Sequence, residues 1–381
     1  MAKLSACAAV SSLLLLLLLL SAAAPPKIEA VAAAASSSYC SIFSFGDSYA
    51  DTGNNPIVFR RHSIAVNPVM RPPYGATFFH RPTGRQSDGR LVIDFIAESL
   101  GLPLVPPFLA RNDDRGFRHG GDNFAVGGAT AIDASFFHRD DPPGGSIFPL
   151  NTSLGVQMQW FESLKPSLCG GNTYKGCKAF FGKSLFFVGS FGANDYLLYM
   201  GNRTVPQVRP IVPDVVATIS IAIERLITHG ATTLVVPGII PFGCAPPVLV
   251  SFANRDPAGH DPTTGCLKGM NDLVTHHNTL LREAVHGIRA KHDDDDVKLV
   301  YADFFGPVME MLTSPAKFGF EDVFEQCCGG PGKFNYNPKV FCGDPGAVTC
   351  KDPSKRVFWD GVHLTEAAYR HIAAAWLSSI I

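Results

Sequence analysis

Five short apolar runs, rich in β-branched and aromatic residues, recur along the chain. Each leads into turn-forming residues such as Gly, Pro, Asp or Asn. Runs of this length, bounded by turn signals, are typical of buried β-strands. The expected strands cover residues 41–45, 124–126, 185–188, 234–236 and 299–302.

Between these runs, apolar residues recur at intervals of three or four positions, which predicts amphipathic helices. The clearest apolar stripes run over 91–100, 215–226 and 273–288. The helix that carries the second stripe is expected to end at Gly230. His277 lies on the apolar stripe of the third segment. We interpret it as a buried, hydrogen-bonded core residue, in preference to a functional one.

Strands that alternate with helices predict an α/β fold with a mostly parallel sheet, covered by helices on both faces. The 381 residues contain no internal repeat and no linker that would separate a second domain. In such sheets the active site lies beyond the carboxyl ends of the strands. Ser48, Gly128 and Asn194 each follow an expected strand, so we expect them at one edge of the sheet.

The candidate chemistry is nucleophilic. Ser48 stands in Gly46-Asp47-Ser48-Tyr49, and Asp360 stands three residues before His363 near the other end of the chain. A serine hydroxyl becomes a useful nucleophile when an imidazole accepts its proton and an acid orients that imidazole. Two Gly- and Asn-containing segments between them, 123–130 and 192–196, are candidates for the oxyanion hole that acyl transfer needs.

These four blocks, in this order, resemble the GDSL esterase/lipase family, also called SGNH hydrolases, and specifically its plant branch. The resemblance covers nearly the whole chain after about residue 40. Further matching segments are Asp51-Thr-Gly-Asn54, Arg81-Pro-Thr-Gly-Arg85, Ser87-Asp-Gly-Arg90, Pro241-Phe-Gly-Cys244 and Cys327-Cys328-Gly329.

The resemblance implies a single-domain, flavodoxin-like three-layer αβα sandwich. It also implies that Ser48 is the nucleophile, His363 the general base and Asp360 its orienter. The oxyanion hole would consist of the backbone N–H groups of Ser48 and Gly128 and the side-chain amide of Asn194. No metal or organic cofactor is expected.

The chain departs from the family pattern at three places. Tyr49 follows the nucleophile where the family usually has Leu, and Leu364 follows the histidine where it usually has Pro. Ser190 ends a segment in which an acidic residue often stands. None of the three changes a catalytic functional group, so they bear on pocket shape more than on reaction type.

The composition limits the classes of partner and substrate that we expect. Hydrophobic residues make up 46% of the chain, which supports a substantial core, and the net charge is −1. The absence of a basic excess argues against nucleic acid and against an anionic membrane surface. We therefore expect a small-molecule or polysaccharide ester as the substrate, without stable membrane insertion.

The N-terminus predicts a signal peptide over residues 1–35. Lys3 precedes an apolar run over 13–20 and then small residues, and cleavage after residue 24, 32 or 35 fits the small-residue rule. The mature domain would span 36–381 and be secreted to the cell wall or apoplast, with the vacuole as an alternative. The sequons at Asn151 and Asn202 are then candidate glycosylation sites.

The chain contains ten cysteines, and Cys7 lies in the expected signal peptide. An oxidising compartment favours disulfides over zinc for the remaining nine. Cys40 is the expected unpaired residue because it is nearest the mature terminus. Two pairs bracket short loops, and a group of four would staple a loop that leads to Asp360. They are Cys169 with Cys177, Cys244 with Cys266, and Cys327, Cys328, Cys342 and Cys350.

Three functions fit these observations. The favoured one is a secreted carboxylic ester hydrolase; the others are an acyltransferase on the same scaffold and a non-catalytic secreted binding protein. The segment 133–150 contains Phe136, Phe137 and Phe148 amid acidic residues, Pro and Gly. Either it is an ordinary surface loop or it forms a groove wall beside Ser48. The second interpretation favours short acyl esters, including acetyl groups on cell-wall polysaccharide.

Overall fold

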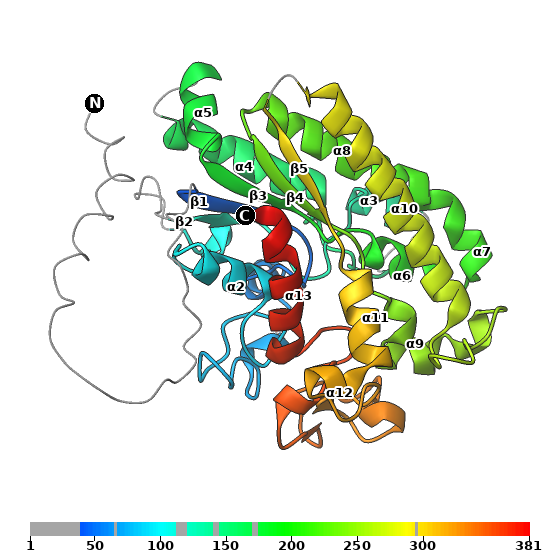
Figure 1. The fold of residues 1–381 in the computed structure, drawn as a ribbon. Coiled ribbons are helices and arrows are strands. Elements are labelled where there is room, and N and C mark those ends of the chain that lie inside the picture. The colour runs from blue at the N-terminus through cyan, green and yellow to red at the C-terminus, as the bar shows by residue number, and fades with distance from the viewer. Residues whose placement is uncertain (1–38, 65–66, 112–119, 140–144, 170–173, 294–295) are drawn as a thin grey trace, which may run out of the picture.

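The computed structural model describes residues 39–64, 67–111, 120–139, 145–169, 174–293 and 296–381. A five-stranded parallel sheet forms its centre, with the strand order β2-β1-β3-β4-β5 (Figure 1). The strands are β1 (Ser41–Phe45), β2 (Gly120–Asn123), β3 (Ser184–Val188), β4 (Thr233–Pro237) and β5 (Lys298–Ala302).

The sheet is buried because its strands are apolar along their whole length. Every residue of β1, β3 and β4 is buried, as expected for parallel strands that are covered on both faces. The strand order is that of flavodoxin-like folds, in which the ligand site lies where the order reverses, beside the first strand. The predicted α/β class and parallel sheet are confirmed.

Helices cover both faces of the sheet. In Figure 1, α2 and α13 lie on one face, while α4, α8 and α10 lie on the other. The helices are α1 (Asn55–Arg61), α2 (Val92–Ser99), α3 (Ala134–Phe137), α4 (Leu154–Leu168), α5 (Tyr174–Phe181), α6 (Ala193–Met200), α7 (Val205–Val208), α8 (Val212–Thr228), α9 (Pro246–Ser251), α10 (Lys268–Lys291), α11 (Phe305–Thr313), α12 (Pro315–Phe318) and α13 (Glu366–Ile380).

The three helices predicted from apolar spacing correspond to α2, α8 and α10. Helix α8 buries a stripe that includes Val215, Ile219, Ile223 and Leu226. In α10, His277 is fully buried, and its Nδ1 lies 2.6 Å from the hydroxyl of Tyr196. Its interpretation as a core residue is confirmed, and burial lowers its pKa to about 3.

The second strand differs from the prediction. It covers Gly120–Asn123, and residues 124–126 follow it as buried chain outside the strand. A side chain on Gly121 would lie 1.9 Å from the carbonyl oxygen of Ile42, so only glycine permits this approach to β1. A count of apolar residues misses such a strand, because glycine and a paired Asp122 replace the usual branched side chains.

Disulfides join Cys169 to Cys177 and Cys244 to Cys266, as the bracketed loops predicted. The group of four cysteines pairs as Cys327–Cys350 and Cys328–Cys342 beside a small antiparallel sheet, β6 (Cys328–Gly329) with β7 (Val348–Thr349).

The expectation that Cys40 is unpaired is wrong. Cys40 is disulfide-bonded, and the part of the chain that the structure describes contains no free cysteine. Nearness to the expected mature terminus is therefore no guide to pairing, because pairing depends on which thiols the folded chain brings together.

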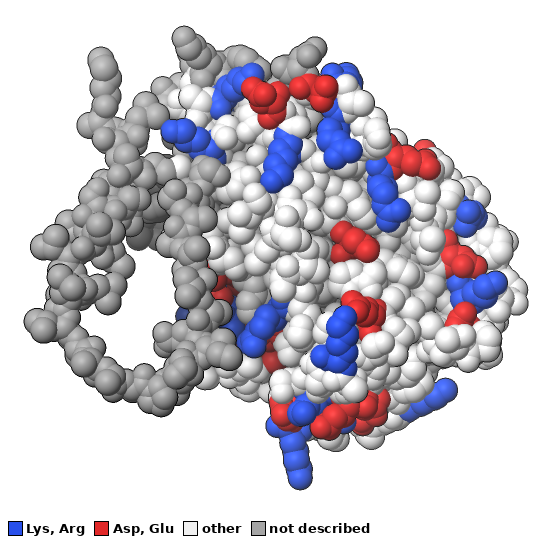
Figure 2. Space-filling view, viewed as in Figure 1, with Lys and Arg blue, Asp and Glu red and all other residues white. Residues whose placement is uncertain are grey.

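The expected signal peptide, 1–35, lies outside the described residues. Across the described ranges, no helix has the length and apolar content to span a membrane. Basic and acidic side chains are interspersed on the face shown in Figure 2. This mixed surface agrees with the near-zero net charge of the sequence.

Candidate active site

Ser48 lies in the tight turn that follows β1. The backbone N–H groups of Ala50 and Asp51 donate to the carbonyl of Asp47, and the N–H of Tyr49 donates to the Asp47 carboxylate at 3.0 Å. The side-chain amide of Gln157 bonds both the N–H and the carbonyl of Gly46. These bonds fix the direction in which the chain leaves the sheet, and hence the position of Ser48.

His363 brings the two ends of the chain together. The Ser48 hydroxyl donates to its Nε2 at 2.8 Å, and its Nδ1 donates to Oδ1 of Asp360 at 2.6 Å. The side chains of His363 and Asp360 are 12% and 7% exposed. The three residues therefore have the contacts of a serine–histidine–acid triad, with the histidine side chain partly exposed.

Burial disfavours the charged form of Asp360, but the charge and hydrogen bond of His363 and a hydrogen bond from Tyr74 oppose this. Together they hold the pKa of Asp360 below its usual range. The carboxylate is therefore ionised at neutral pH, which is the state that can orient and stabilise an imidazolium.

The turn that carries Asp360 and His363 is tied to the nucleophile turn. The N–H of Trp359 donates to the carbonyl of His363, and the hydroxyl of Tyr49 donates to the carbonyl of Val362, both at 2.7 Å. Tyr49, which stands where the family usually has Leu, therefore makes a hydrogen bond to Val362 that a leucine could not make. Leu364, the second departure, is fully buried.

Two neighbouring glycines in the second block have different surroundings. The N–H of Gly127 donates to Oδ2 of Asp51 at 2.8 Å, whereas the N–H of Gly128 has no acceptor among the described residues. A Cβ on Gly128 would meet no atom within 4 Å. Of the two glycines, Gly128 is therefore the one whose N–H is not used within the described structure.

Asn194 follows the turn after β3 and lies in the first turn of α6. Its side-chain Nδ2 donates to the carbonyl of Ala129 at 2.9 Å, which places the amide beside the chain that contains Gly128. The carboxylate of Asp195 accepts the N–H groups of Ala131 and Ile132, both at 2.9 Å. The second and third blocks are therefore held together by hydrogen bonds.

Buried carboxylates organise these loops. Asp51 accepts four backbone N–H groups, and burial raises its pKa to about 6 despite these donors. Asp47 has fewer donors, since one Oδ atom accepts from Tyr49 and Ser190 while the other has no partner in the described part of the chain. Burial raises the pKa of Asp47 to about 7.

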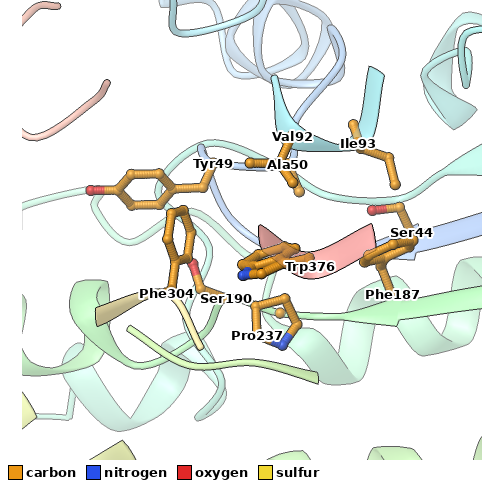
Figure 3. A pocket seen from close by; sticks show the side chains of 11 residues that line it. Ser44, Tyr49, Ala50, Val92, Ile93, Phe187, Ser190, Pro237, Phe304 and Trp376 are labelled. Atoms are coloured by element: carbon orange, nitrogen blue, oxygen red, sulfur yellow. The ribbon is translucent and has the colours of Figure 1, made fainter. Parts of the chain in front are cut away.

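A small cavity of about 20 Å³ lies behind the nucleophile turn, between the sheet and α13. Figure 3 shows Ser44, Phe187 and Trp376 around it, with the hydroxyl of Tyr49 pointing away. A space of this size accommodates about one water molecule and no substrate. It reflects packing beneath the site, and neither Ser48 nor His363 lines it.

The C-terminal disulfides support the chain next to Asp360. The N–H of Cys327 donates to the carbonyl of Phe358 at 2.9 Å, and the N–H of Cys328 donates to that of Trp359 at 2.7 Å. The stapled loop thus forms backbone hydrogen bonds to the two residues immediately before the acid. The sequence predicted the position of these disulfides correctly, but it did not predict the backbone hydrogen bonds that connect them to the chain before Asp360.

One residue that contacts the triad was missed. The hydroxyl of Tyr74 donates to Oδ2 of Asp360 in a short hydrogen bond, and the side chain is buried. Tyr74 lies 286 residues before Asp360, in a Pro- and Gly-rich segment without periodicity. Nothing in the sequence pattern connects the two positions.

The segment that follows Gly128 is partly packed and partly open. Phe136 lies against the ring of Tyr199 at 5.5 Å, and Phe148 is 42% exposed beside Phe59. A groove of about 730 Å³ runs along this segment. Its lining includes His62, Asp133, Ser135, His138, Ile147 and Asn151. The segment therefore borders a groove, and neither Ser48 nor His363 is among the residues that line it.

The model of the family described as GDSL-like lipase/acylhydrolase matches residues 42–376. A GDSL esterase/lipase of Arabidopsis thaliana is 44% identical over 348 residues, covering 89% of this chain and 90% of that protein. A sinapine esterase of Brassica napus is 38% identical over 344 residues, covering 88% and 84%.

Among solved structures, a phospholipase A1 from Streptomyces albidoflavus matches with 13% sequence identity and a TM-score of 0.34. That match covers 90% of this chain and 100% of the other.

Proposed function

Because this chain belongs to the GDSL-like lipase/acylhydrolase family and is a carboxylic ester hydrolase, we propose that it forms an acyl-enzyme on Ser48. His363 is the general base and Asp360 orients it. One observation carries the proposal: the continuous hydrogen-bonded series from the Ser48 hydroxyl through His363 to Asp360.

In the first half-reaction, the Ser48 oxygen attacks the ester carbonyl carbon while Nε2 of His363 accepts the hydroxyl proton. Asp360 stabilises the resulting imidazolium through Nδ1. The tetrahedral intermediate collapses when the bond to the leaving oxygen breaks, and Nε2 returns the proton to the alcohol. The second half-reaction repeats these steps with water as the nucleophile and releases the acid and free Ser48.

The oxyanion of each tetrahedral intermediate would be held by the N–H groups of Ser48 and Gly128 and the side chain of Asn194. The unshared N–H of Gly128 and the fixed amide of Asn194 support this assignment. Donors that are already in place cost no reorganisation when charge develops, which is why such groups accelerate the reaction.

The nucleophile assignment is tested by Ser48→Ala beside Ser44→Ala as a matched control. Ser44 is buried four residues earlier, and its Oγ has no partner among the described residues, so its loss costs little. Ser48→Ala should abolish hydrolysis of 4-nitrophenyl acetate and labelling by a serine-reactive phosphonate, while Ser44→Ala retains both. Activity of Ser48→Ala above a few per cent of wild type would exclude Ser48 as the nucleophile.

For the substrate, we infer short acyl esters, including acetyl groups on cell-wall polysaccharide. The groove along the segment after Gly128 supports this inference, because His62, Asp133, Ser135 and His138 offer hydrogen-bonding groups to a hydroxyl-rich molecule. Ile147 and exposed Phe148 add apolar and aromatic surface beside them. A uniformly apolar groove would instead favour a long acyl chain.

Comparing acetyl, butyryl, octanoyl and palmitoyl esters of one alcohol with acetylated xylan tests the substrate class. We expect the highest kcat/KM for acetyl or butyryl esters and release of acetate from the xylan. A preference for octanoyl or longer chains would contradict the short-acyl proposal. Activity on small esters without acetate release from xylan would contradict its polysaccharide part.

We also infer that the protein is secreted and glycosylated. Four disulfides between described cysteines fit an oxidising compartment. Asn151 and Asn202 are exposed, as glycan acceptors must be. N-terminal sequencing of the secreted protein and its mobility after glycosidase treatment test both inferences. An unprocessed N-terminus would contradict secretion, and an unchanged mobility would contradict glycosylation.

A further inference from the structure

The carboxylate of Asp360 has two side-chain partners, one for each oxygen. Oδ1 accepts from Nδ1 of His363, and Oδ2 accepts from the hydroxyl of Tyr74. The second bond comes from a loop outside the sheet, far from Asp360 in the sequence. A triad acid needs the first bond for catalysis; the second requires a separate explanation.

Tyr74 is held firmly where it meets Asp360. Its side chain is 3% exposed, and its ring meets the edge of Trp359 with centroids 5.9 Å apart. Its N–H donates to the carbonyl of Arg71, and Arg71 forms an ion pair of 2.6 Å with Asp344 in the disulfide loop. The phenol is therefore fixed by packing against Trp359 and by the connection of its loop to the disulfide loop through Arg71.

We propose that Tyr74 is a positioning residue for the triad, fixing the rotation of the Asp360 carboxylate so that Oδ1 faces His363. The terminal torsion of an aspartate side chain is broad and only weakly restricted by itself. A hydrogen bond to Oδ2 from a rigid ring removes that freedom. This inference rests on the proposed role of Asp360 as the orienting acid.

The bond also balances charge at a buried site. Burial, followed by the charge of Asp360, raises the pKa of Tyr74 well above its usual value, so the phenol remains a donor at every physiological pH. Without that donor, Oδ2 would be a buried anionic oxygen with no described side-chain partner. The hydrogen bond from Tyr74 is one of the contacts that lower the pKa of Asp360, so its loss would raise that pKa.

Tyr74→Phe isolates the hydroxyl because the ring is kept. We expect kcat for 4-nitrophenyl acetate to fall about 10- to 100-fold, the loss of a hydrogen bond to a charged group, with KM changed less than about threefold. The acid limb of the kcat/KM profile should move to higher pH, because the Asp360 carboxylate, which must be ionised to orient His363, would then take up its proton at a higher pH. A purely structural role for Tyr74 would not move that limb.

Tyr49→Phe is the matched comparison. It also removes a buried phenolic hydroxyl that bonds the same turn, but its acceptor is the backbone carbonyl of Val362. We expect this variant to leave the acid limb in place, whatever its effect on kcat. Equal shifts of the acid limb in both variants would mean that any loosening of the turn has this effect, and would overturn the proposal.

A double-mutant cycle with Asp360→Ala completes the test. If Tyr74 acts through Asp360, Tyr74→Phe should cause no further loss of kcat in the Asp360→Ala background. This double variant also removes the unpaired oxygen, so it remains informative if Tyr74→Phe alone folds poorly. The proposal for Tyr74 would be overturned if the double variant lost kcat by the product of the two single losses. An unchanged kcat and acid limb in Tyr74→Phe would overturn it as well. An active Asp360→Ala enzyme would instead refute the role of Asp360.

Discussion

The Cys327–Cys350 disulfide should contribute to catalysis as well as to stability. Cys327 donates its N–H to Phe358 and accepts the N–H of Cys350 at 2.7 Å, so the disulfide and the chain before Asp360 form one hydrogen-bonded unit. The perturbation is the paired substitution Cys327→Ser with Cys350→Ser, which removes the bond without leaving a single reactive thiol.

The size of the effect follows from the length of the closed loop. The sequence separation is 23 residues, for which loop-closure entropy corresponds to about 3.4 kcal/mol of stability. The Cys328–Cys342 disulfide lies inside this loop and retains part of the constraint, so the measured loss should be smaller. A tenfold fall in kcat requires only about 1.4 kcal/mol of lost transition-state stabilisation. The loop-closure entropy acts on the unfolded chain and therefore lowers the melting temperature. The fall in kcat, which we expect to be at least tenfold at 25 °C, comes instead from loosening the backbone hydrogen bonds of Cys327 and Cys328 to Phe358 and Trp359.

The matched control is Cys169→Ser with Cys177→Ser. This disulfide spans 8 residues, for which the same calculation yields about 2.5 kcal/mol. It joins α4 to α5, and in the described ranges neither cysteine bonds to the 358–363 segment.

Thermal unfolding and kcat for 4-nitrophenyl acetate should be measured for both double variants. We expect the control to lose stability while it keeps its kcat. Equal and small losses of kcat in the two variants, with similar losses of stability, would refute the link between the disulfide and the position of Asp360.

Three further predictions concern charge and hydrogen bonding at the site. Asn194→Ala should lower kcat about 10²- to 10³-fold with little change in KM, because an oxyanion donor acts in the transition state; a change in KM alone would assign Asn194 to substrate binding. Asp360→Asn should lower kcat by up to ~10⁴ through the wrong imidazole tautomer, as in serine protease triads, and a loss below tenfold would contradict its role. Because burial raises the pKa of Asp47 from 3.8 to about 7, its stabilising contribution is complete below pH 3.8 and is lost as the pH rises through 7. The melting temperature should therefore fall more between pH 5 and 7.5 in wild type than in Asp47→Asn, and equal slopes would contradict the burial of a neutral Asp47.

The sequence was sufficient for the architecture because local patterns and global fold agree. Apolar runs and helical spacing predicted four of the five strands and the helices α2, α8 and α10. Turn residues after the runs predicted that Ser48 and Asn194 would emerge at one edge of the sheet. The exception is β2, which contains Gly120 and Gly121. Gly121 has no side chain, and this absence lets β2 pack closely against β1.

The sequence by itself determined which chemical groups are present and their order: a serine after the first strand, two candidate oxyanion segments, and an acid three residues before a histidine. Only the tertiary structure decided their contacts. It distinguished Gly128 from Gly127 through the bond to Asp51, paired the cysteines, and brought Tyr74 to Asp360. The physical reason is that hydrogen bonds and disulfides depend on distances and directions between atoms far apart in the chain, whereas periodicity reports only on neighbours.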